Sequence, residues 1–494
     1  MNRLAKMVVL TLALLCLYTI GAGAAIARLL PARLALLQVP QVATRTLARG
    51  DAALRGASGS PRAGAGRATP AGVSTRLAAL IGSGSLGPRV GALVTDLSTG
   101  RVLYSLNATT GFTPASTTKL ATAVAALHIL GPAATFTTSA WIGKTEAADA
   151  GMPRGASRRI VLVGGGDPTL AAGRYPAADY PQPATLSSLA AATARQLRAR
   201  RITSVRLGYD DALFGGPVLG PGWPAFGTTN NYISSGNVAP ITGLEVDQGR
   251  LTARGRPEDS DDPGNLRPRS LTPGLDAARA FARFLRKDGI AVHGPLTRAV
   301  APTGGSRLAQ VHSPPLAAIV QQMLAESNNV IAEMVARQVA VATGRPGNFS
   351  GAAATVMAVD RRLGISGISV HDGSGLSPLD LITPTALVRL VRLAAQQGQA
   401  RLRPVLTGLP VAGFYGTLGP RSFFGPFGRP ALGLVRAKTG NLTGVATMAG
   451  LAYAKNGQIF AFAFMGNGIG KRLGLKPEYT LSQLATVLAS CGCR

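Results

Sequence analysis

The 494-residue sequence predicts a mixed α/β fold whose catalytic domain is interrupted by a large insertion. Strand-like apolar runs occur near both ends of the globular part, at residues 90–108 and 431–467, and segments with helical spacing lie between them. Residues 216–275 are instead rich in Gly, Pro and Asp and contain few periodic runs. The chain is long enough for more than one domain with its own core.

Each predicted element follows from local pattern. Residues 90–108 form two short strands joined by the turn residues Ser98, Thr99 and Gly100. A helix that is apolar nearly all round follows, ending near residue 130. Further strands are predicted at 135–143 and 160–170, and helices at 186–201, 276–289, 315–340 and 383–397. Two strands, 431–454 and 459–467, and a helix, 481–490, close the chain.

The first 30 residues predict export. Arg3 and Lys6 precede an uncharged run over residues 7–26 that is long enough to span a bilayer. Residues 1–30 are therefore a cleaved signal peptide or a retained membrane anchor, and either one places the bulk of the chain outside the cytoplasm. Residues 31–77 are Ala-, Gly- and Arg-rich and predict a disordered linker.

The net charge of +29 favours anionic surroundings such as acidic lipids or anionic polymers of the cell envelope. No nucleic-acid-binding motif accompanies this charge, so no nucleic-acid partner is predicted. Beyond the leader, Cys491 and Cys493 lie at the extreme carboxy terminus, where a disulfide would close too small a loop to stabilise a fold. The four histidines are scattered, and neither a metal nor another cofactor is predicted.

Ser116 and Lys119 lie three residues apart where the apolar helix begins, on one helical face. A serine hydroxyl needs a base to become a nucleophile, and a desolvated lysine can be that base. In isolation, S-x-x-K more often reads as an ordinary helix start with a solvated lysine. Here the following helix is apolar nearly all round, which makes an unpaired lysine costly. We therefore take Ser116 and Lys119 as candidate catalytic residues.

Two further motifs lie downstream. Ser327 and Asn329 sit within the predicted helix 315–340, where a hydroxyl could relay a proton and an amide could hold the base. The same S-x-N spacing occurs elsewhere, and a polar helix face or a helix junction would also explain it. Lys438, Thr439 and Gly440 interrupt a strand, and glycine there lets a ligand approach the backbone closely. An ordinary bulge would explain that motif equally well.

In combination, S-x-x-K, S-x-N and K-T-G resemble the motif set of the penicillin-recognising serine enzymes. The long interval between Ser116 and Ser327 resembles the D-alanyl-D-alanine carboxypeptidase/endopeptidase family, the class C low-molecular-mass penicillin-binding proteins. Four more stretches match that family: GGGDPTL at 164–170, PGW at 221–223, HDGSGLSPLDLITP at 371–384 and LPVAGFYGTL at 409–418. The likeness runs from about residue 78 to the end.

The resemblance implies a β-lactamase/transpeptidase-like catalytic domain, with an antiparallel sheet flanked by helices. Its halves would be residues 78–141 and 303–494, separated by a large, mostly β inserted domain over 142–302. The implied substrates are peptidoglycan stem peptides, with β-lactams as covalent inhibitors.

The resemblance also implies a role for each site residue. The implied catalytic residues are Ser116 (nucleophile), Lys119 (base), Ser327, Asn329 and Lys438. Lys438 and Thr439 would bind the substrate's terminal carboxylate, and Gly440 would belong to the same substrate-binding segment. The backbone N–H of Asn441 would join that of Ser116 in the oxyanion hole. Asn441 departs from the family, which usually has Ser or Thr after K-T-G, so a hydroxyl that would help hold the substrate carboxylate is missing.

Three alternatives compete with this interpretation. Ser374, within the stretch 371–375, could belong to a different hydrolase, but neighbours in sequence do not guarantee convergence in space. A β-lactamase would need a deacylating carboxylate that the sequence does not locate. A non-catalytic protein that binds anionic wall polymer would explain the charge and the linker, but it leaves Ser116, Lys119 and Lys438 unexplained.

Overall fold

The computed structural model describes residues 67–143, 158–175, 180–229, 231–251, 267–420, 422, 428–470 and 476–493. All of them belong to one compact unit, Gly59–Arg494. The leader predicted over 1–30 and most of the linker predicted over 31–77 lie outside the described residues. No helix among the described residues combines the length and the apolar character needed to cross a membrane.

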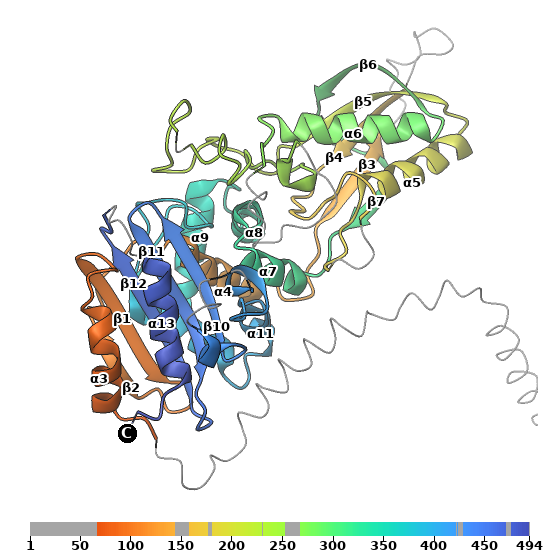
Figure 1. Ribbon diagram of the computed structural model, residues 1–494. Helices are drawn as coiled ribbons and strands as arrows, with labels where there is room; N and C mark the ends of the chain where they lie inside the picture. Colours follow the sequence, from red (N-terminus) through yellow and green to blue (C-terminus); the bar gives the residue numbers. More distant parts are fainter. Residues whose placement is uncertain are drawn as a thin grey trace, which may run out of the picture. The chain divides into compact units, whose positions relative to one another are not determined.

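Five antiparallel strands form the central sheet in the order β10-β11-β12-β1-β2. They are β1 (Arg89–Asp96), β2 (Val102–Leu106), β10 (Val435–Leu442), β11 (Val445–Tyr453) and β12 (Ile459–Asn467). The two halves of the sequence meet where β1 pairs with β12, from Arg89 opposite Asn467 to Asp96 opposite Phe460 (Figure 1). The stretch 431–454, predicted as one strand, is a hairpin of β10 and β11.

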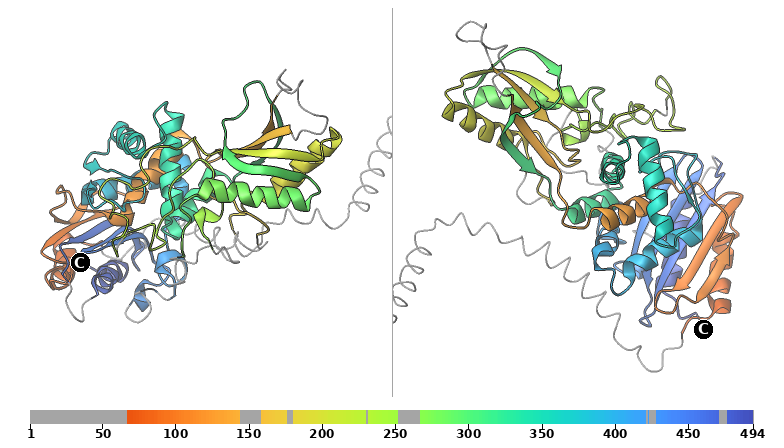
Figure 2. Two further views of the ribbon diagram at one scale, coloured as in Figure 1. Left: turned by 90° about the horizontal axis from the view of Figure 1, so that it is seen from above. Right: turned by 180° about the vertical axis from the view of Figure 1, so that it is seen from behind.

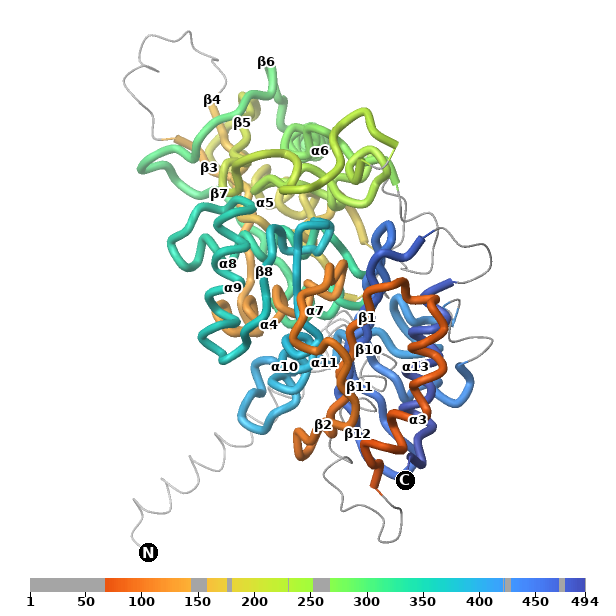
Figure 3. The backbone as a smooth tube through the Cα atoms, turned by 90° about the vertical axis from the view of Figure 1, so that its left-hand side faces the viewer, coloured from red at the N-terminus to blue at the C-terminus, as the bar shows by residue number. Residues whose placement is uncertain are grey.

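One face of the sheet is covered by α3 (Pro70–Ile81) and α13 (Pro477–Ala489), which also contact each other (Figure 3). The phenylalanines of β12, Phe460, Phe462 and Phe464, are fully buried in the core that these helices close. Alanines alternate with them along β12 and point to the opposite face, because successive strand side chains point to opposite sides. Their small size lets α10 (Pro384–Ala395) pack closely there.

The other helices of the catalytic domain lie on the α10 side. They are α4 (Lys119–Ile129), α7 (Leu316–Ala325), α8 (Asn329–Ala342), α9 (Phe349–Arg362) and α11 (Arg403–Thr407). Helix α4 packs against α7, α8, α9, α10 and α11, and nine consecutive residues from Lys119 to Leu127 are buried. An apolar sequence without a polar face is therefore what this central position requires.

The linker boundary predicted at residue 77 is too late, because α3 begins at Pro70. Thr69 caps this helix by accepting a hydrogen bond from the Gly72 amide, and Pro70 occupies its first turn. Val73 and Leu77 are completely buried. These two apolar anchors are enough to fix a segment whose overall composition resembles a linker.

The insertion contains a second five-stranded sheet in the order β6-β5-β4-β3-β7. Its strands are β3 (Thr137–Ile142), β4 (Arg158–Val163), β5 (Ser204–Asp210), β6 (Ala291–Arg298) and β7 (Ser306–His312). Strands β4, β5 and β6 are parallel, and the other pairs are antiparallel. Helices α5 (Leu186–Ala199) and α6 (Pro273–Lys287) pack on each other and on the strands, as Figure 2 shows for the green α6.

The insertion is wider at both ends than the predicted range 142–302. Strands β3 and β7 belong to its sheet, where Thr137 lies opposite His312. This pairing joins segments far apart in the chain, so local pattern did not reveal it.

A long irregular segment after β5 leaves the insertion's sheet and packs on the catalytic domain. Its apolar side chains, Trp223, Ile233 and Val238 among them, form a buried cluster with Met334 of α8 and Phe349 of α9. Two short strands, β8 (Ile368–Ser369) and β9 (Leu381–Ile382), pair with each other, and β9 directly precedes α10 in the sequence.

Candidate active site

Ser116 lies in a 3-10 turn, η2 (Ala115–Thr118), directly before α4. Ala115 has a positive φ of 49°, a strained conformation that persists only where the surroundings enforce it. Close packing provides that enforcement: a Cβ added to Gly375 would collide with the Ala115 carbonyl group. One added to Gly440 would lie 3.0 Å from the Ser116 nitrogen. Ser116 is thus held against two other segments of the chain.

The Lys119 side chain is completely buried beside Ser116. Its Nζ donates to Ser116 Oγ at 2.9 Å, to Asn329 Oδ1 at 2.7 Å and to the Ser374 carbonyl oxygen at 2.8 Å. These three acceptors satisfy the three N–H bonds of an ammonium group. After loss of one proton, the neutral amine can instead accept a hydrogen bond from the Ser116 hydroxyl.

Burial lowers the pKa of Lys119 from 10.5 to about 7, because a charged amine is costly away from water. The negative charges of Asp372 and Glu333 oppose this effect and keep the pKa from falling further. Near neutral pH the amine therefore exists in both protonation states, as a group that takes a proton from a hydroxyl must.

Ser327 lies at a break between α7 and α8, whereas the sequence predicted one helix over 315–340. Its φ of 55° ends the first helix, and Asn328 caps the second by accepting the Ile331 amide at 3.1 Å. Ser327 Oγ accepts a hydrogen bond from Lys438 Nζ at 2.9 Å. The helix junction therefore presents the hydroxyl to a second lysine.

The insertion contributes directly to the orientation of Asn329. Its Nδ2 donates to the Asn237 carbonyl oxygen at 3.1 Å, which turns Oδ1 toward Lys119. The preceding Asn328 donates from Nδ2 to Gln248 Oε1 at 2.7 Å. The segment after β5 is thus a part of the site's support.

Lys438 in β10 is also completely buried. Besides Ser327 Oγ, its Nζ reaches the Thr439 carbonyl oxygen at 2.7 Å. Burial lowers the pKa of Lys438 well below 10.5, and the positive charge of Lys119 lowers it further. Two amines in one dry site favour a bound anion, which would relieve their mutual repulsion.

The outer edge of β10 runs beside Ser116. The Ala437 N–H donates to the Pro410 carbonyl at 3.1 Å and so points away from β11. Because N–H directions alternate along a strand, the Asn441 N–H also points outward. The close approach of Gly440 to the Ser116 nitrogen brings this edge next to η2. Such a pair of amides has the placement needed to stabilise a developing oxyanion.

The structure therefore joins Ser116, Lys119 and Asn329 in one hydrogen-bonded group, and Ser327 with Lys438 in a second. Electrostatic coupling between the two lysines connects the groups. In the part of the chain that the structure describes, no cluster of His, Cys, Asp or Glu is arranged to hold a metal ion. A serine next to a partly neutral amine, with backbone donors alongside, is suited to acyl transfer.

The sequence matches the family model described as the D-Ala-D-Ala carboxypeptidase 3 (S13) family over residues 73–267 and 245–488. The chain belongs to this family. The resemblance derived from the motifs is thereby confirmed.

Two relatives share most of the chain. Carboxypeptidase DacB of Mycolicibacterium smegmatis is 36% identical over 432 residues, covering 86% of this chain and 85% of that protein. A carboxypeptidase of Mycobacterium tuberculosis is 37% identical over 439 residues, covering 86% of each.

A solved structure agrees on the fold. Penicillin-binding protein 4 (dacB) from Haemophilus influenzae superposes with a TM-score of 0.65 at 23% identity, covering 83% of this chain and 98% of that one. The predicted transpeptidase-like catalytic domain with an inserted domain is confirmed.

The sequence interpretation did not identify two buried carboxylates that support the loop in contact with Lys119. Glu333 of α8 accepts the backbone amides of Gly373 and Ser374, the latter at 2.8 Å. Asp372 accepts three amides of the same loop, among them Gly375 at 2.6 Å. Together they fix the loop that presents the Ser374 carbonyl to Lys119. The family stretch HDGSGLS at 371–377 was the available signal, but it did not reveal this role.

The same loop argues against Ser374 as a nucleophile. The Ser374 side chain is fully buried, and its Oγ accepts the Leu376 amide at 3.4 Å. Asp372 is occupied by backbone amides and by Trp223 Nε1 at 2.8 Å. His371 lies next to Asp380, with 3.4 Å between Nδ1 and Oδ1. These three side chains do not converge as a catalytic triad would.

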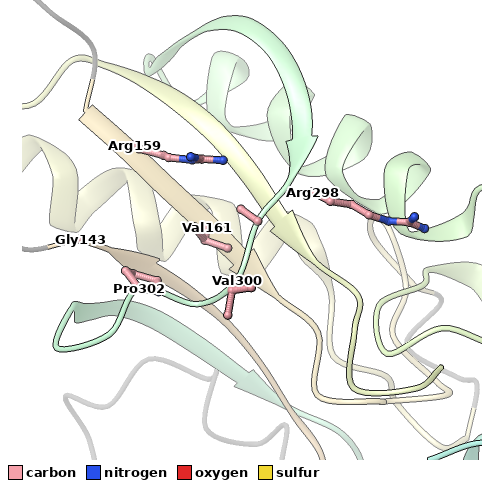
Figure 4. A pocket seen from close by; sticks show the side chains of 7 residues that line it. Gly143, Arg159, Val161, Arg298, Val300 and Pro302 are labelled. Atoms are coloured by element: carbon pink, nitrogen blue, oxygen red, sulfur yellow. The ribbon is translucent and has the colours of Figure 1, made fainter.

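A pocket of about 370 Å³ lies on the insertion (Figure 4). Its lining consists of Gly143, Arg159, Val161, Arg298, Ala299, Val300 and Pro302. Arg298 forms an ion pair with Asp211 at 3.1 Å. None of the residues predicted for catalysis lines this pocket.

Proposed function

We propose that this protein is a serine DD-peptidase that acts on peptidoglycan stem peptides through an acyl-enzyme on Ser116. One observation carries the proposal: the 2.9 Å hydrogen bond between Ser116 Oγ and the buried amine of Lys119, whose pKa is about 7. The family relationship supports the reaction class.

In the acylation step, neutral Lys119 takes the proton of the Ser116 hydroxyl as Oγ attacks the carbonyl carbon of the penultimate D-Ala. The carbonyl oxygen becomes an oxyanion, and the N–H groups of Ser116 and Asn441 donate to it. Asn329 holds the base by accepting from its amine at 2.7 Å. The C–N bond then breaks, which leaves an ester on Ser116.

The leaving amine must gain a proton as the C–N bond breaks. Ser327 Oγ donates it and is replenished from Lys438 Nζ, its hydrogen-bond partner at 2.9 Å. Before the second half-reaction, Lys119 gives up the proton that it took from Ser116 and Lys438 regains one, by exchange through solvent, so both amines return to their starting states. Water then attacks the ester. Neutral Lys119 takes a proton of that water and passes it to Ser116 Oγ as the ester C–O bond breaks, which releases the peptide acid and restores the enzyme.

The substrate class follows from the proposed acyl donor. If the leaving residue is a terminal D-Ala, the activity is carboxypeptidase, as in the names of the mycobacterial relatives. If the leaving group is instead the residue of a neighbouring stem peptide that is joined through its D-configured centre in a cross-link, the activity is endopeptidase. Both reactions use the same acyl-enzyme, and we propose both for this chain, with penicillin as a covalent inhibitor. The beta-lactam complex of the Haemophilus influenzae protein supports this choice of inhibitor.

The proposed place of action is outside the cytoplasm, where peptidoglycan lies. The apolar run over residues 7–26 would export or anchor the chain, and residues 31–66 would tether the catalytic part. The net charge of +29 favours the anionic envelope surface.

Labelling with a fluorescent penicillin tests the proposal. We expect a stable covalent adduct with the wild-type chain and none with Ser116→Ala. No adduct with either protein would favour a non-catalytic scaffold, and rapid turnover of the penicillin would favour a β-lactamase. Release of D-Ala from a D-Ala-D-Ala peptide, absent in Ser116→Ala, would establish the peptidase itself.

A further inference from the structure

The residue after K-T-G is turned away from the reacting groups. Asn441 Nδ2 donates to Glu478 Oε1 of α13 at 2.8 Å, in an exposed position. This side chain is thus engaged by a helix on the opposite side of the sheet from α4. The family usually has the hydroxyl of a Ser or Thr after K-T-G. In this chain a hydroxyl at that place has to come from a residue other than Asn441.

A second hydroxyl does lie beside the motif. Thr417 belongs to a 3-10 turn, η7 (Gly416–Leu418), and its Oγ1 is 3.0 Å from Thr439 Oγ1. Both side chains are partly accessible to solvent. When one hydroxyl donates to the other, the acceptor's own hydrogen remains available for a ligand.

The backbone fixes the position of Thr417. The preceding segment pairs with β10, with the Ala412 N–H donating to the Val435 carbonyl at 3.0 Å. This pairing ends at Ala437, and η7 turns off beside the next residues of β10. Gly416 has a φ of 65°, and a Cβ added to it would lie 2.6 Å from the Ala325 carbonyl oxygen. The turn is therefore wedged between β10 and the end of α7.

The buried amine of Lys438 lies next to this hydroxyl pair. Lys438 Nζ lies 2.7 Å from the Thr439 carbonyl oxygen, and the pKa of Lys438 is held low by burial and by Lys119. A carboxylate would offset that repulsion and accept the free hydroxyl hydrogen. Hydrogen bonds to a charged acceptor are stronger than those between neutral groups.

Thr439 is the residue that the family resemblance already implies in binding the substrate's terminal carboxylate. We infer that Thr417 is a further specificity-determining residue, whose hydroxyl joins that of Thr439 in binding the α-carboxylate of the leaving D-residue. This assignment rests on the proposed function. The substrates it selects are peptides with a free carboxylate on the residue that departs. A terminal D-Ala and the D-centre of a cross-link both satisfy this requirement, whereas a peptide capped as an amide does not.

The test compares diacetyl-L-Lys-D-Ala-D-Ala with its C-terminal amide in the wild type, Thr417→Ala and Thr417→Ser. For Thr417→Ala we expect KM for the acid to rise about ten-fold, the size of one lost hydrogen bond to a charged group. The amide should be unaffected, so that acid-over-amide preference falls by the same factor. Thr417→Ser should restore the preference. Thr486→Ala removes a comparable hydroxyl from α13, bonded only to a backbone carbonyl in the helix, and serves as the control.

Two results would overturn the assignment. An unchanged acid-over-amide preference in Thr417→Ala would remove Thr417 from substrate recognition. Equal losses on both substrates would make its role structural. Penicillin labelling of Ser116 separates the two levels: with a labelled wild type, these results overturn only the role of Thr417. If the wild type is not acylated at Ser116, the proposed function falls and the assignment falls with it.

Discussion

Two buried lysines lie at the two sides of the site, and their surroundings differ. Lys119 and Lys438 are both excluded from solvent, which lowers the pKa of each amine. Two carboxylates, Asp372 and Glu333, counteract this for Lys119 and leave its pKa at about 7. For Lys438 the second influence is the positive charge of Lys119, which lowers its pKa further.

The difference teaches that burial alone does not make a base at neutral pH. Lys119 is tuned because negative charge is built into the protein beneath it, on α8 and on the loop that follows β8. Lys438 lacks that protein charge, and a substrate carboxylate would supply it on binding. Under the proposed function, the first lysine can exchange a proton in the free enzyme, whereas the second would respond to the substrate.

The largest effect should come from replacing the lysines with an uncharged side chain of similar length. Lys119→Met should slow acylation by penicillin by about 10²–10⁴-fold, the usual contribution of a general base. Lys438→Met should slow it less and should raise KM for peptide substrate more. A time course of penicillin labelling and a measurement of KM for a peptide substrate compare the two variants, and circular dichroism verifies that each is folded. A greater loss of acylation in Lys438→Met would reverse the assigned roles.

The contact between β10, which carries Lys438, and η2, which carries Ser116, can be disturbed at Gly440. A methyl group there would meet Thr447 Oγ1 and the Pro114 carbonyl oxygen, and so would push β10 away from η2. We expect Gly440→Ala to reduce the acylation rate by about 10²-fold, as misplacement by about 1 Å does. Gly470→Ala, where nothing lies within 4 Å of the added Cβ, is the matched control. Full activity of Gly440→Ala would show that the close approach is unimportant.

The carboxylates beneath Lys119 predict a pH dependence. Protonated Lys119 cannot accept the Ser116 proton, so the acylation rate should fall as pH drops through about 7. Glu333→Gln removes a negative charge that favours the protonated amine, and the acid limb should move to lower pH. Burial and the charge of Asp372 raise the pKa of Glu333 itself to about 7, so the effect of its charge is greatest above that pH.

Rates of penicillin acylation between pH 5 and 9 measure this shift. Asp276→Asn removes a carboxylate on α6 that pairs with Arg279 at the surface, and it should leave the profile in place. A profile for Glu333→Gln that moves to higher pH would contradict the electrostatic account.

The smallest effect concerns a buried acid outside the site. Asp360 of α9 is buried, neither of its carboxylate oxygens has a hydrogen-bond partner, and burial raises its pKa well above 3.8. The folded state then holds a proton that the unfolded state releases above pH 3.8, so this group's contribution to stability is lost as pH rises. Asp360→Asn should increase the free energy of unfolding at pH 7 by roughly 1–3 kcal/mol. Urea denaturation at pH 5 and pH 7 checks this, and a lower stability of the variant at pH 7 would contradict it.

Much of the site could be predicted because its residues are unusual in their local context. A lysine at the start of an apolar helix and a Lys-Thr-Gly within a strand both conflict with simple packing, so they drew attention to Lys119 and Lys438. The supporting residues gave no such signal. Glu333 reads as an ordinary helix residue, and the role of Asn237 depends on its backbone carbonyl, which any residue type provides.

Elements of the fold were missed where the decisive interactions are not local. The apolar spacing of 315–340 continues through Ser327, so only the backbone angle at that residue reveals two helices. Helix α9 begins Phe-Ser-Gly-Ala-Ala-Ala, and its small residues give little periodic contrast, although Asn348 caps it by accepting the Gly351 amide at 2.8 Å. Strand β3 was predicted but was assigned to the catalytic domain, and β7 was not predicted as a strand, because their pairing spans the whole insertion.

The most direct test of the central claim is peptide mapping by mass spectrometry after penicillin treatment at a series of pH values. The account predicts a single adduct on the peptide that contains Ser116, formed at a rate that rises with a midpoint near pH 7. An adduct on any other serine, or a rate on Ser116 that is the same at pH 5 and pH 8, would contradict it.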